Sequence, residues 1–187
     1  MSVKAGVLAL QGDFREHARV IERVGATPVE VRTADELAGV DCLVIPGGES
    51  TTMATLARSD GLVDPVRTRA AAGMPIFGTC AGMIVLAKRV EGGEALFELL
   101  DITVRRNAYG RQVESFEADL EVEGIDHPVR GVFIRAPRVE DLGPDVRVLA
   151  EHEGHPVVLE QENLLVASFH PELVGEAALH EYFLGKV

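Results

Sequence analysis

Residues 74–87 read MPIFGTCAGMIVLA and place a single cysteine, Cys80, between two glycines. The apolar segment at residues 74–77 is typical of a short buried strand, and residues 83–87 are typical of an apolar helix. A cysteine between glycines, where a strand gives way to a helix, predicts a sharp turn that lifts its side chain above the sheet. Cys80 is therefore the candidate nucleophile.

His170 is the candidate general base, because it follows a second strand-like run, LLVASF at residues 164–169. Pro171 restricts its own φ and disfavours a helical conformation at His170, so an extended or turning segment is predicted. In an extended segment, residues two apart point to the same side. We therefore expect Glu172 to hydrogen-bond one imidazole nitrogen while the other nitrogen faces Cys80, as in a nucleophile–base–carboxylate triad.

Strand-like and helix-like segments alternate through the first half of the sequence. The predicted strands are residues 5–10, 27–31, 42–45 and 74–77, and the predicted helices are residues 14–24, 52–58 and 63–72. Asp13 is the expected cap of the first helix, and Gly25 is its expected stop. This alternation predicts an α/β fold with a mainly parallel sheet and helices on both of its faces.

The second half of the sequence contains short strand candidates separated by turn residues. They lie at residues 102–104, 114–121, 129–134, 146–151 and 156–160. We expect them to extend or flank the parallel core as antiparallel strands, with residues 164–169 returning to the sheet and a helix at 176–184. Because no break in composition divides the chain, residues 1–187 are expected to form one domain.

Composition and charge exclude several function classes. The net charge of −12, without a cluster of Lys and Arg, argues against a nucleic-acid partner. Neither a membrane-spanning run nor a signal peptide is expected. Cys42 fits a buried core position, and two unpaired cysteines predict a reducing, cytoplasmic location. The histidines other than His170 are scattered without tetrahedral spacing, so neither a metal nor a cofactor is expected.

Three candidate segments follow predicted strands, and they should meet at the carboxyl edge of the sheet, where open α/β sheets bind ligands. Two of these segments are the Cys80 turn and the His170 segment. The third is the loop PGGES at residues 46–50. Its glycines, Gly47 and Gly48, let backbone amides approach a ligand closely, which suits an oxyanion hole completed by the Ala81 N–H. A phosphate-binding loop is excluded, because no Gly-Lys-Ser/Thr follows the glycine pair.

These motifs together resemble the class I, or triad, glutamine amidotransferases, and within that group the glutaminase subunits of pyridoxal 5′-phosphate synthases. The matching segments are LQG (10–12), PGGESTTM (46–53), GTCAG (78–82), RNAYGRQ (106–112), SFEA (115–118), FIRAP (133–137) and SFHPE (168–172). Many class I domains carry a glutamine where this chain has Ile84. That departure fits the vitamin B6 branch and counts against the nucleotide and carbamoyl-phosphate branches.

The resemblance implies a class I glutamine amidotransferase-like three-layer sandwich, which is flavodoxin-like or Rossmann-like. It also implies hydrolysis of L-glutamine to glutamate and ammonia through a γ-glutamyl thioester on Cys80, with His170 as base and then acid. The glutamine-binding positions of the family map onto Gly48, Glu49, Ser50, Arg106, Ile134 and Arg135. An arginine suits the α-carboxylate of glutamine, and Glu49 suits its α-ammonium group. The sequence leaves open whether Arg105 or Arg106 faces the site.

The resemblance further implies a partner. We expect no second domain in this chain that would use the ammonia, and the family delivers it to a (β/α)₈-barrel synthase subunit within a hetero-oligomer. Gln11 and the Gly47–Gly48 loop are the candidate coupling point.

Alternatives to this interpretation stay open. Another cysteine hydrolase on a similar sheet, peptidase-like or deglycase-like, would share the cysteine turn, and a glutaminase could serve a different synthase. The non-enzyme alternative is an inactive regulatory or scaffold subunit, against which the complete Cys80, His170 and Glu172 set argues.

Overall fold

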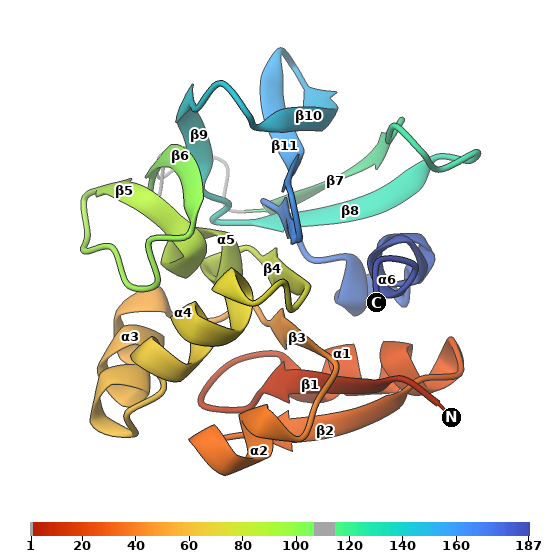
Figure 1. Ribbon diagram of the computed structural model, residues 1–187. Helices are drawn as coiled ribbons and strands as arrows, with labels where there is room; N and C mark the ends of the chain where they lie inside the picture. The colour runs from red at the N-terminus through yellow and green to blue at the C-terminus, as the bar shows by residue number, and fades with distance from the viewer. Residues whose placement is uncertain (1, 107–114) are drawn as a thin grey trace.

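The structure, a computed structural model, describes residues 2–106 and 115–187. Within these residues the central sheet has seven strands: β1 (Lys4–Leu8), β2 (Thr27–Val31), β3 (Cys42–Ile45), β4 (Ile76–Thr79), β10 (Arg147–His152), β11 (His155–Gln161) and β12 (Leu164–Ala167). Their order across the sheet is β10-β11-β12-β4-β3-β1-β2 (Figure 1). The five strands from β12 to β2 are parallel, and β10 and β11 extend the sheet as antiparallel strands. The predicted mainly parallel sheet with added antiparallel strands is confirmed.

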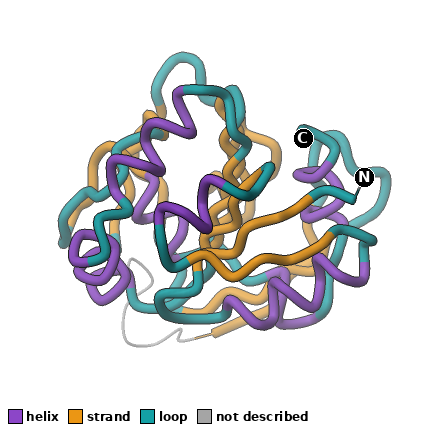
Figure 2. The backbone as a smooth tube through the Cα atoms, turned by 60° about the horizontal axis from the view of Figure 1, so that its bottom comes forward, coloured by secondary structure: helices purple, strands orange, loops and turns teal. Residues whose placement is uncertain are grey.

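Helices cover both faces of this sheet (Figure 2). They are α1 (Phe14–Arg23), α2 (Ala34–Ala38), α3 (Ser50–Ser59), α4 (Val63–Ala71), α5 (Ala81–Leu86) and α6 (Ala178–Leu184). Side chains alternate along each strand, so Leu43 and Ile45 join one apolar core while Cys42 and Val44 join the other. The first core includes residues of α2, α3, α4 and α5, and the second includes residues of α1 and α6. The chain is therefore a three-layer α/β/α sandwich.

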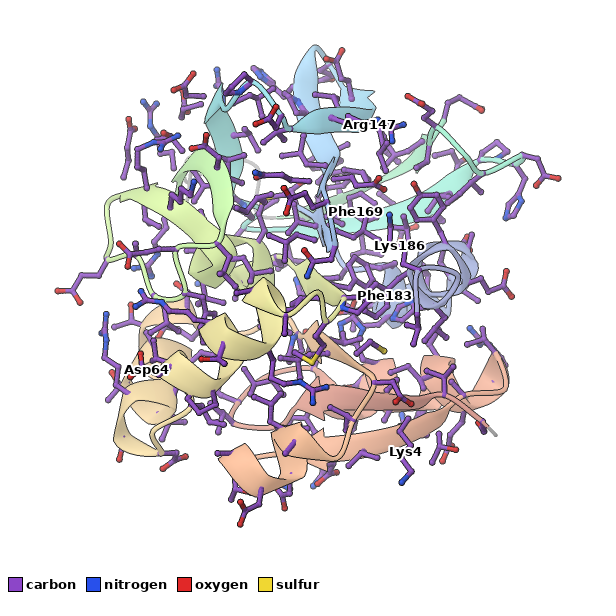
Figure 3. The ribbon with its side chains drawn as sticks, viewed as in Figure 1. Lys4, Asp64, Arg147, Phe169, Phe183 and Lys186 are labelled. Atoms are coloured by element: carbon purple, nitrogen blue, oxygen red, sulfur yellow. The ribbon has the colours of Figure 1, made fainter. Side chains whose placement is uncertain are left out.

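The second core holds the large aromatic side chains near the end of the chain. Phe169 and Phe183 lie in the interior, whereas Lys4 and Asp64 lie at the periphery (Figure 3). None of the helices in residues 2–106 and 115–187 is long and apolar enough to cross a membrane.

Two smaller sheets flank the central one. The first contains β5 (Ala87–Glu91), β6 (Leu100–Arg105) and β9 (Arg138–Leu142), and the second pairs β7 (Ser115–Leu120) with β8 (Val129–Ile134). The five short strands expected in this half are present to within two residues at each described end, and residue 114 lies outside the described residues. The sequence prediction missed β5 and β9, because their charged, largely exposed segments show no clear apolar alternation.

Element boundaries differ from prediction where backbone hydrogen bonding decides them. The fourth strand was predicted at residues 74–77 but begins at Ile76, because Pro75 has no N–H and the Met74 N–H is donated to the Arg69 carbonyl at the end of α4. The short helix α2 was also missed. Its start is marked by a capping box between Thr33 and Glu36.

Candidate active site

Four neighbouring strands bring the site residues to one edge of the sheet. Strands β12, β4, β3 and β1 lie side by side, and the segments after their carboxyl ends hold His170, Cys80, Gly48 and Asp13 respectively. A cavity of about 420 Å³ lies at this edge, lined by Asp13, Gly48, Glu49, Ser50, Cys80, Ile84, Arg106, Ile134, Arg135, His170 and Leu173. The three candidate segments thus meet at one cavity, which also contains every position predicted to contact glutamine.

Cys80 occupies the turn between β4 and α5 with a positive φ, at φ 51° and ψ −105°. Such a conformation in a non-glycine residue costs roughly 1–3 kcal/mol and is concentrated at functional sites. The turn is tight, because a Cβ added at Gly82 would lie 2.2 Å from the Ile45 carbonyl oxygen. The Cys80 Sγ lies 3.9 Å from the Ile134 carbonyl oxygen on the cavity wall. The predicted sharp turn is confirmed.

His170 and Glu172 form the pair that the sequence predicts, but by a different local structure. The His170 Nδ1 lies 2.7 Å from the Glu172 Oε1, and both side chains are buried. The segment is not extended: a 3-10 helix, η1 (Pro171–Val174), begins at Pro171 and contains Glu172. The turn of this helix, rather than strand alternation, brings the carboxylate to the imidazole.

Asp13 is the site residue whose role the sequence prediction missed. It precedes α1 as expected, yet its side chain makes no capping hydrogen bond. Its Oδ2 instead lies 3.3 Å from the His170 Nδ1 and lines the cavity. The signal was present, since Asp13 follows the first strand of the parallel sheet and so reaches the same edge as the other candidates.

The pKa of His170 is raised above its ordinary value. Burial acts to lower this pKa, but hydrogen bonds with Asp13, Cys80 and Glu172 outweigh it. Burial also raises the pKa of Glu172, more than its contact with His170 lowers it. Because carboxylate oxygens of Asp13 and Glu172 both face the imidazole, the proton is held on His170.

Asp13, His170 and Glu172 are also close enough together to hold a metal ion. In the described part of the chain, Asp13, His170 and Glu172 form the group of acidic and histidine ligands whose atoms lie within 4.8 Å of one another. The His170 Nδ1 is the shared hydrogen-bonding partner of both carboxylates, which accounts for the clustering without an ion. The expectation of no metal site stays a prediction.

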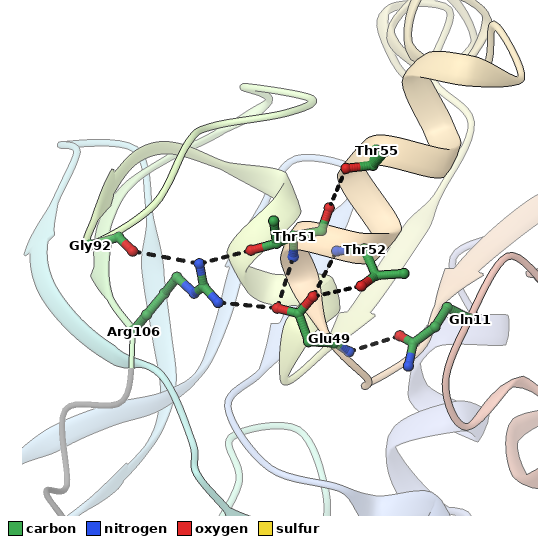
Figure 4. A network of polar contacts seen from close by, with 7 residues as sticks. All are labelled: Gln11, Glu49, Thr51, Thr52, Thr55, Gly92 and Arg106. Carbon is green, nitrogen blue, oxygen red and sulfur yellow. Dashed lines mark hydrogen bonds and ion pairs between the residues drawn. The ribbon is translucent and has the colours of Figure 1, made fainter.

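Glu49 and Arg106 face the cavity as an ion pair (Figure 4). Glu49 caps α3, because its carboxylate accepts hydrogen bonds from the Thr51 N–H at 3.1 Å and the Thr52 N–H at 2.7 Å. Hydrogen bonds from the Thr52 side chain and backbone lower the pKa of Glu49 to about 2. The Arg106 guanidinium lies 3.2 Å from the Glu49 Oε1 and 3.1 Å from the Thr51 hydroxyl.

Arg105 points away from this cavity. Its Nε lies 2.9 Å from the Glu91 carboxylate and 3.5 Å from Glu140. Arg106 is therefore the arginine that faces the site, which answers the choice that the sequence left open. The rest of the segment that carried part of the resemblance, residues 107–112, lies outside the described residues.

The glycine loop lies directly against the histidine. A Cβ added at Gly47 would lie 2.2 Å from the His170 Cε1, so only glycine lets the ring lie there. The Gln11 side chain reaches the same loop, where its Oε1 accepts a hydrogen bond from the Glu49 N–H at 2.7 Å. Ala81 is the first residue of α5, a position whose N–H has no intrahelical acceptor.

Two histidines described above as scattered lie together behind the site. The His17 Nδ1 lies 2.8 Å from the His180 Nε2, and both side chains are fully buried. Their separation of 163 positions hides this contact in the sequence, and it forms because α1 and α6 pack on the same face of the sheet.

Cys42 behaves as the core residue that the sequence predicts. It is fully buried and unpaired. Burial, and then the neighbouring charge of Asp41, raise the pKa of its thiol to about 12. Cys42 is therefore an unreactive thiol at neutral pH.

A cysteine with a positive φ at a strand–helix turn, next to a buried histidine–carboxylate pair, defines the class of triad amidotransferases and hydrolases. Comparison with known sequences places the chain within that class: residues 7–187 match the SNO glutamine amidotransferase family, and the chain belongs to this family. The resemblance drawn from the motifs is confirmed.

The similar proteins carry more particular names. The chain is 56% identical to the pyridoxal 5′-phosphate synthase subunit PdxT of Acidothermus cellulolyticus, over 98% of this chain and 93% of that protein. It is 54% identical to the PdxT subunit of Mycolicibacterium vanbaalenii, over 98% and 97% of the two chains. A crystal structure of a glutamine amidotransferase superimposes with a TM-score of 0.94 at 51% identity, covering 97% of each chain.

Proposed function

We propose that this chain is a glutaminase that hydrolyses L-glutamine and passes the ammonia to a separate synthase subunit that makes pyridoxal 5′-phosphate. Family membership and the PdxT relatives support this proposal. The observation that carries it is one cavity of about 420 Å³ that contains Cys80, His170 and the predicted glutamine contacts. In this proposal residues 1–187 act as one glutaminase domain.

The reaction begins with transfer of the Cys80 thiol proton to His170, and the resulting thiolate attacks the carboxamide carbon of glutamine. The C–N bond breaks as His170 donates its proton to the leaving nitrogen, which departs as ammonia and leaves a γ-glutamyl thioester. His170 then takes a proton from water, whose oxygen attacks the thioester. The C–S bond then breaks, glutamate leaves, and the Cys80 thiolate and protonated His170 are regenerated. Glu172 and Asp13, which both face the His170 Nδ1, hold the imidazole in place and stabilise its protonated form.

Charge complementarity supports glutamine as the substrate. Arg106 would hold the α-carboxylate, and Glu49 would hold the α-ammonium group. These two groups pair with each other at 3.2 Å in the structure, so substrate binding exchanges one ion pair for two. Ser50, the Gly48 backbone, Ile134 and Arg135 complete the lining around the carboxamide chain.

The tetrahedral intermediate needs donors for its oxyanion. We assign this role to backbone N–H groups of the Gly47–Gly48 loop and to the Ala81 N–H at the start of α5. Both lie beside the reacting groups: the loop packs on His170, and Ala81 directly follows Cys80.

The partner in this proposal is a (β/α)₈-barrel synthase subunit in a hetero-oligomer, and the location is the cytoplasm. Gln11 is the proposed coupling residue, because its side chain joins the glycine loop through the Glu49 N–H. No nucleic-acid or membrane role is proposed, and the chain needs no cofactor for the chemistry described.

The experiment mixes the purified chain with a candidate barrel subunit and follows pyridoxal 5′-phosphate formation. The proposal expects product with glutamine and with ammonium salts, and loss of only the glutamine-dependent reaction in Cys80→Ala. Product from ammonium but not from glutamine would overturn the assignment of this chain. Cleavage of peptides or sugar adducts without glutamine hydrolysis would instead favour the other cysteine hydrolases.

A further inference from the structure

A buried polar chain continues behind the histidine–carboxylate pair. Glu172 uses Oε1 to bind His170, whereas its Oε2 is buried and has no hydrogen-bond partner within the described residues. The His17 Nε2 lies 3.4 Å from that oxygen and 3.0 Å from the Thr79 hydroxyl. His17 in turn contacts His180 on its other side, at 2.8 Å. These groups come from α1, β4, η1 and α6.

Both histidines behind the pair are neutral at physiological pH. Burial, and then the neighbouring charges of His180 and His170, lower the pKa of His17 well below its usual value. Burial, and then the charge of Arg23, lower the pKa of His180 to about 3. Each ring therefore carries one N–H, and the direction of the hydrogen bond between them decides which nitrogen of His17 is protonated.

The carboxylate decides that direction. An ionised carboxylate only accepts hydrogen bonds, and a buried acceptor without a donor is costly. A proton on the His17 Nε2 faces both the Thr79 hydroxyl, at 3.0 Å, and the Glu172 Oε2, at 3.4 Å, and so places a donor beside the carboxylate. In this arrangement His180 donates its Nε2–H to the His17 Nδ1. In the opposite arrangement the His17 Nδ1–H is donated to the His180 Nε2, and the Glu172 Oε2 is left without a donor. The His180 Nδ1 is also buried without a partner, but an unpaired nitrogen on a neutral ring costs less than an unpaired carboxylate oxygen.

We propose that His17 is a positioning residue of this active site, which donates its Nε2–H to the Glu172 oxygen that His170 does not use. His180 fixes the required tautomer from behind, so that the chain runs from His180 through His17 and Glu172 to His170. The kinetic test of this inference rests on the proposed function, whereas the hydrogen-bond geometry does not.

The test compares two amides at position 17. Glutamine at this position places its side-chain NH₂ near the histidine Nε2, whereas the shorter asparagine reaches only the Nδ1 position. His17→Gln should therefore keep the contact with Glu172, and His17→Asn should lose it. Because both side chains are polar and buried, a general packing defect would affect the two variants alike. Val20→Ala, on the buried face of the same helix, is the matched control for loss of stability.

Two readouts separate positioning from simple destabilisation. The first is kcat for glutamine hydrolysis with the barrel subunit present. His17→Asn should lower kcat roughly tenfold to a hundredfold, the range typical of residues that orient a reacting side chain through an outer hydrogen bond. KM should change little, and His17→Gln should restore most of the rate. Val20→Ala should leave kcat per folded molecule unchanged.

The second readout is the pH dependence of Cys80 alkylation by iodoacetamide, located by mass spectrometry, which needs neither glutamine nor a partner. Loss of the hydrogen-bond donor destabilises the ionised carboxylate of Glu172. The acidic limb of the alkylation profile should therefore move to higher pH in His17→Asn and not in Val20→Ala. Identical alkylation profiles in His17→Gln, His17→Asn and the unmodified protein would overturn the proposal. If the alkylation profile shifts in His17→Asn and not in Val20→Ala, but the unmodified protein hydrolyses no glutamine, the proposed function is rejected and the positioning role is retained.

Discussion

The imidazole of His170 and the carboxylate of Glu172 meet at 2.7 Å through a turn of 3-10 helix that begins at the proline between them. This pair is built locally, from three consecutive residues. Asp13 reaches the same imidazole nitrogen from the start of α1, at 3.3 Å. The site therefore combines a local pair with groups that arrive from distant parts of the chain, and the two kinds can be tested separately.

Replacement of Asp13 tests the second carboxylate. Asp13→Asn should lower the pKa of His170, because removal of a nearby negative charge weakens the protonated imidazole. The alkaline limb of the kcat/KM profile should then move to lower pH, with a loss of roughly twofold to tenfold in kcat/KM at pH 8. Asp64→Asn makes the same charge change on the surface of α4 and should leave the profile unchanged. Equal shifts in both variants would contradict a direct effect on His170.

Neighbouring arginines provide a matched pair for substrate binding. Arg106→Ala removes the guanidinium beside Glu49 at the cavity, whereas Arg105→Ala removes one that pairs with Glu91 and Glu140 outside it. A hydrogen-bonded charged group contributes about 1.5–3 kcal/mol, so Arg106→Ala should raise the KM for glutamine roughly tenfold to a hundredfold. Arg105→Ala should stay within about twofold. Steady-state kinetics with the barrel subunit measures both, and a larger effect in Arg105→Ala would reverse the assignment.

The close contact between Gly47 and His170 predicts a severe effect of one methyl group. Gly47→Ala should displace the imidazole and lower kcat by at least about a hundredfold, since a displacement near 1 Å has that effect on catalysis. Gly39→Ala is the control, because Gly39 has a φ of −88° and a Cβ there meets nothing closer than 3.5 Å. It should change the free energy of unfolding by less than about 1 kcal/mol. A normal kcat in Gly47→Ala would contradict this prediction, because it would show that the loop moves to accommodate the methyl group.

The buried neutral histidines predict that stability falls with acid. The folded-state pKa of His180 is lowered to about 3, so below its unfolded pKa only the unfolded chain binds this proton. Stability therefore falls as the pH decreases through that unfolded value. Between pH 7 and pH 5.5, with an unfolded pKa near 6.5, this histidine contributes a loss of roughly 1 kcal/mol. His180→Gln removes that contribution, and denaturant titrations at the two pH values measure the difference. An unchanged pH slope in His180→Gln would contradict the neutral assignment.

The sequence predicted the parts of the site that are encoded by short motifs. The Cys80 turn, the PGGES loop and the His-Pro-Glu segment each follow a strand of a parallel sheet, and one general rule then places them at the same edge. These motifs can be recognised in the sequence because tight geometry requires glycine: a side chain would not fit at the positions beside Cys80 or at the position that packs on His170. The family resemblance added the glutamine positions.

The parts that escaped prediction depend on contacts between distant segments. Asp13 reads as a helix cap in sequence, and only the approach of η1 to α1 turns its carboxylate toward His170. His17 and His180 show no pattern in sequence, because their contact requires α1 and α6 to pack on the same sheet face. The choice between Arg105 and Arg106 depended on where β6 ends: Arg105 is its last residue and pairs with Glu91 and Glu140, whereas Arg106 lies in the turn beyond it and pairs with Glu49.

If Cys80 is the nucleophile of a glutaminase, a diazo-ketone analogue of glutamine should label it covalently. We expect one adduct, located on Cys80 by mass spectrometry, with loss of glutamine hydrolysis in proportion to labelling and protection by glutamine. Cys42 should stay unlabelled, because it is buried and its thiol pKa is raised to about 12. Labelling of another residue, or glutamine hydrolysis that survives complete labelling of Cys80, would exclude Cys80 as the nucleophile.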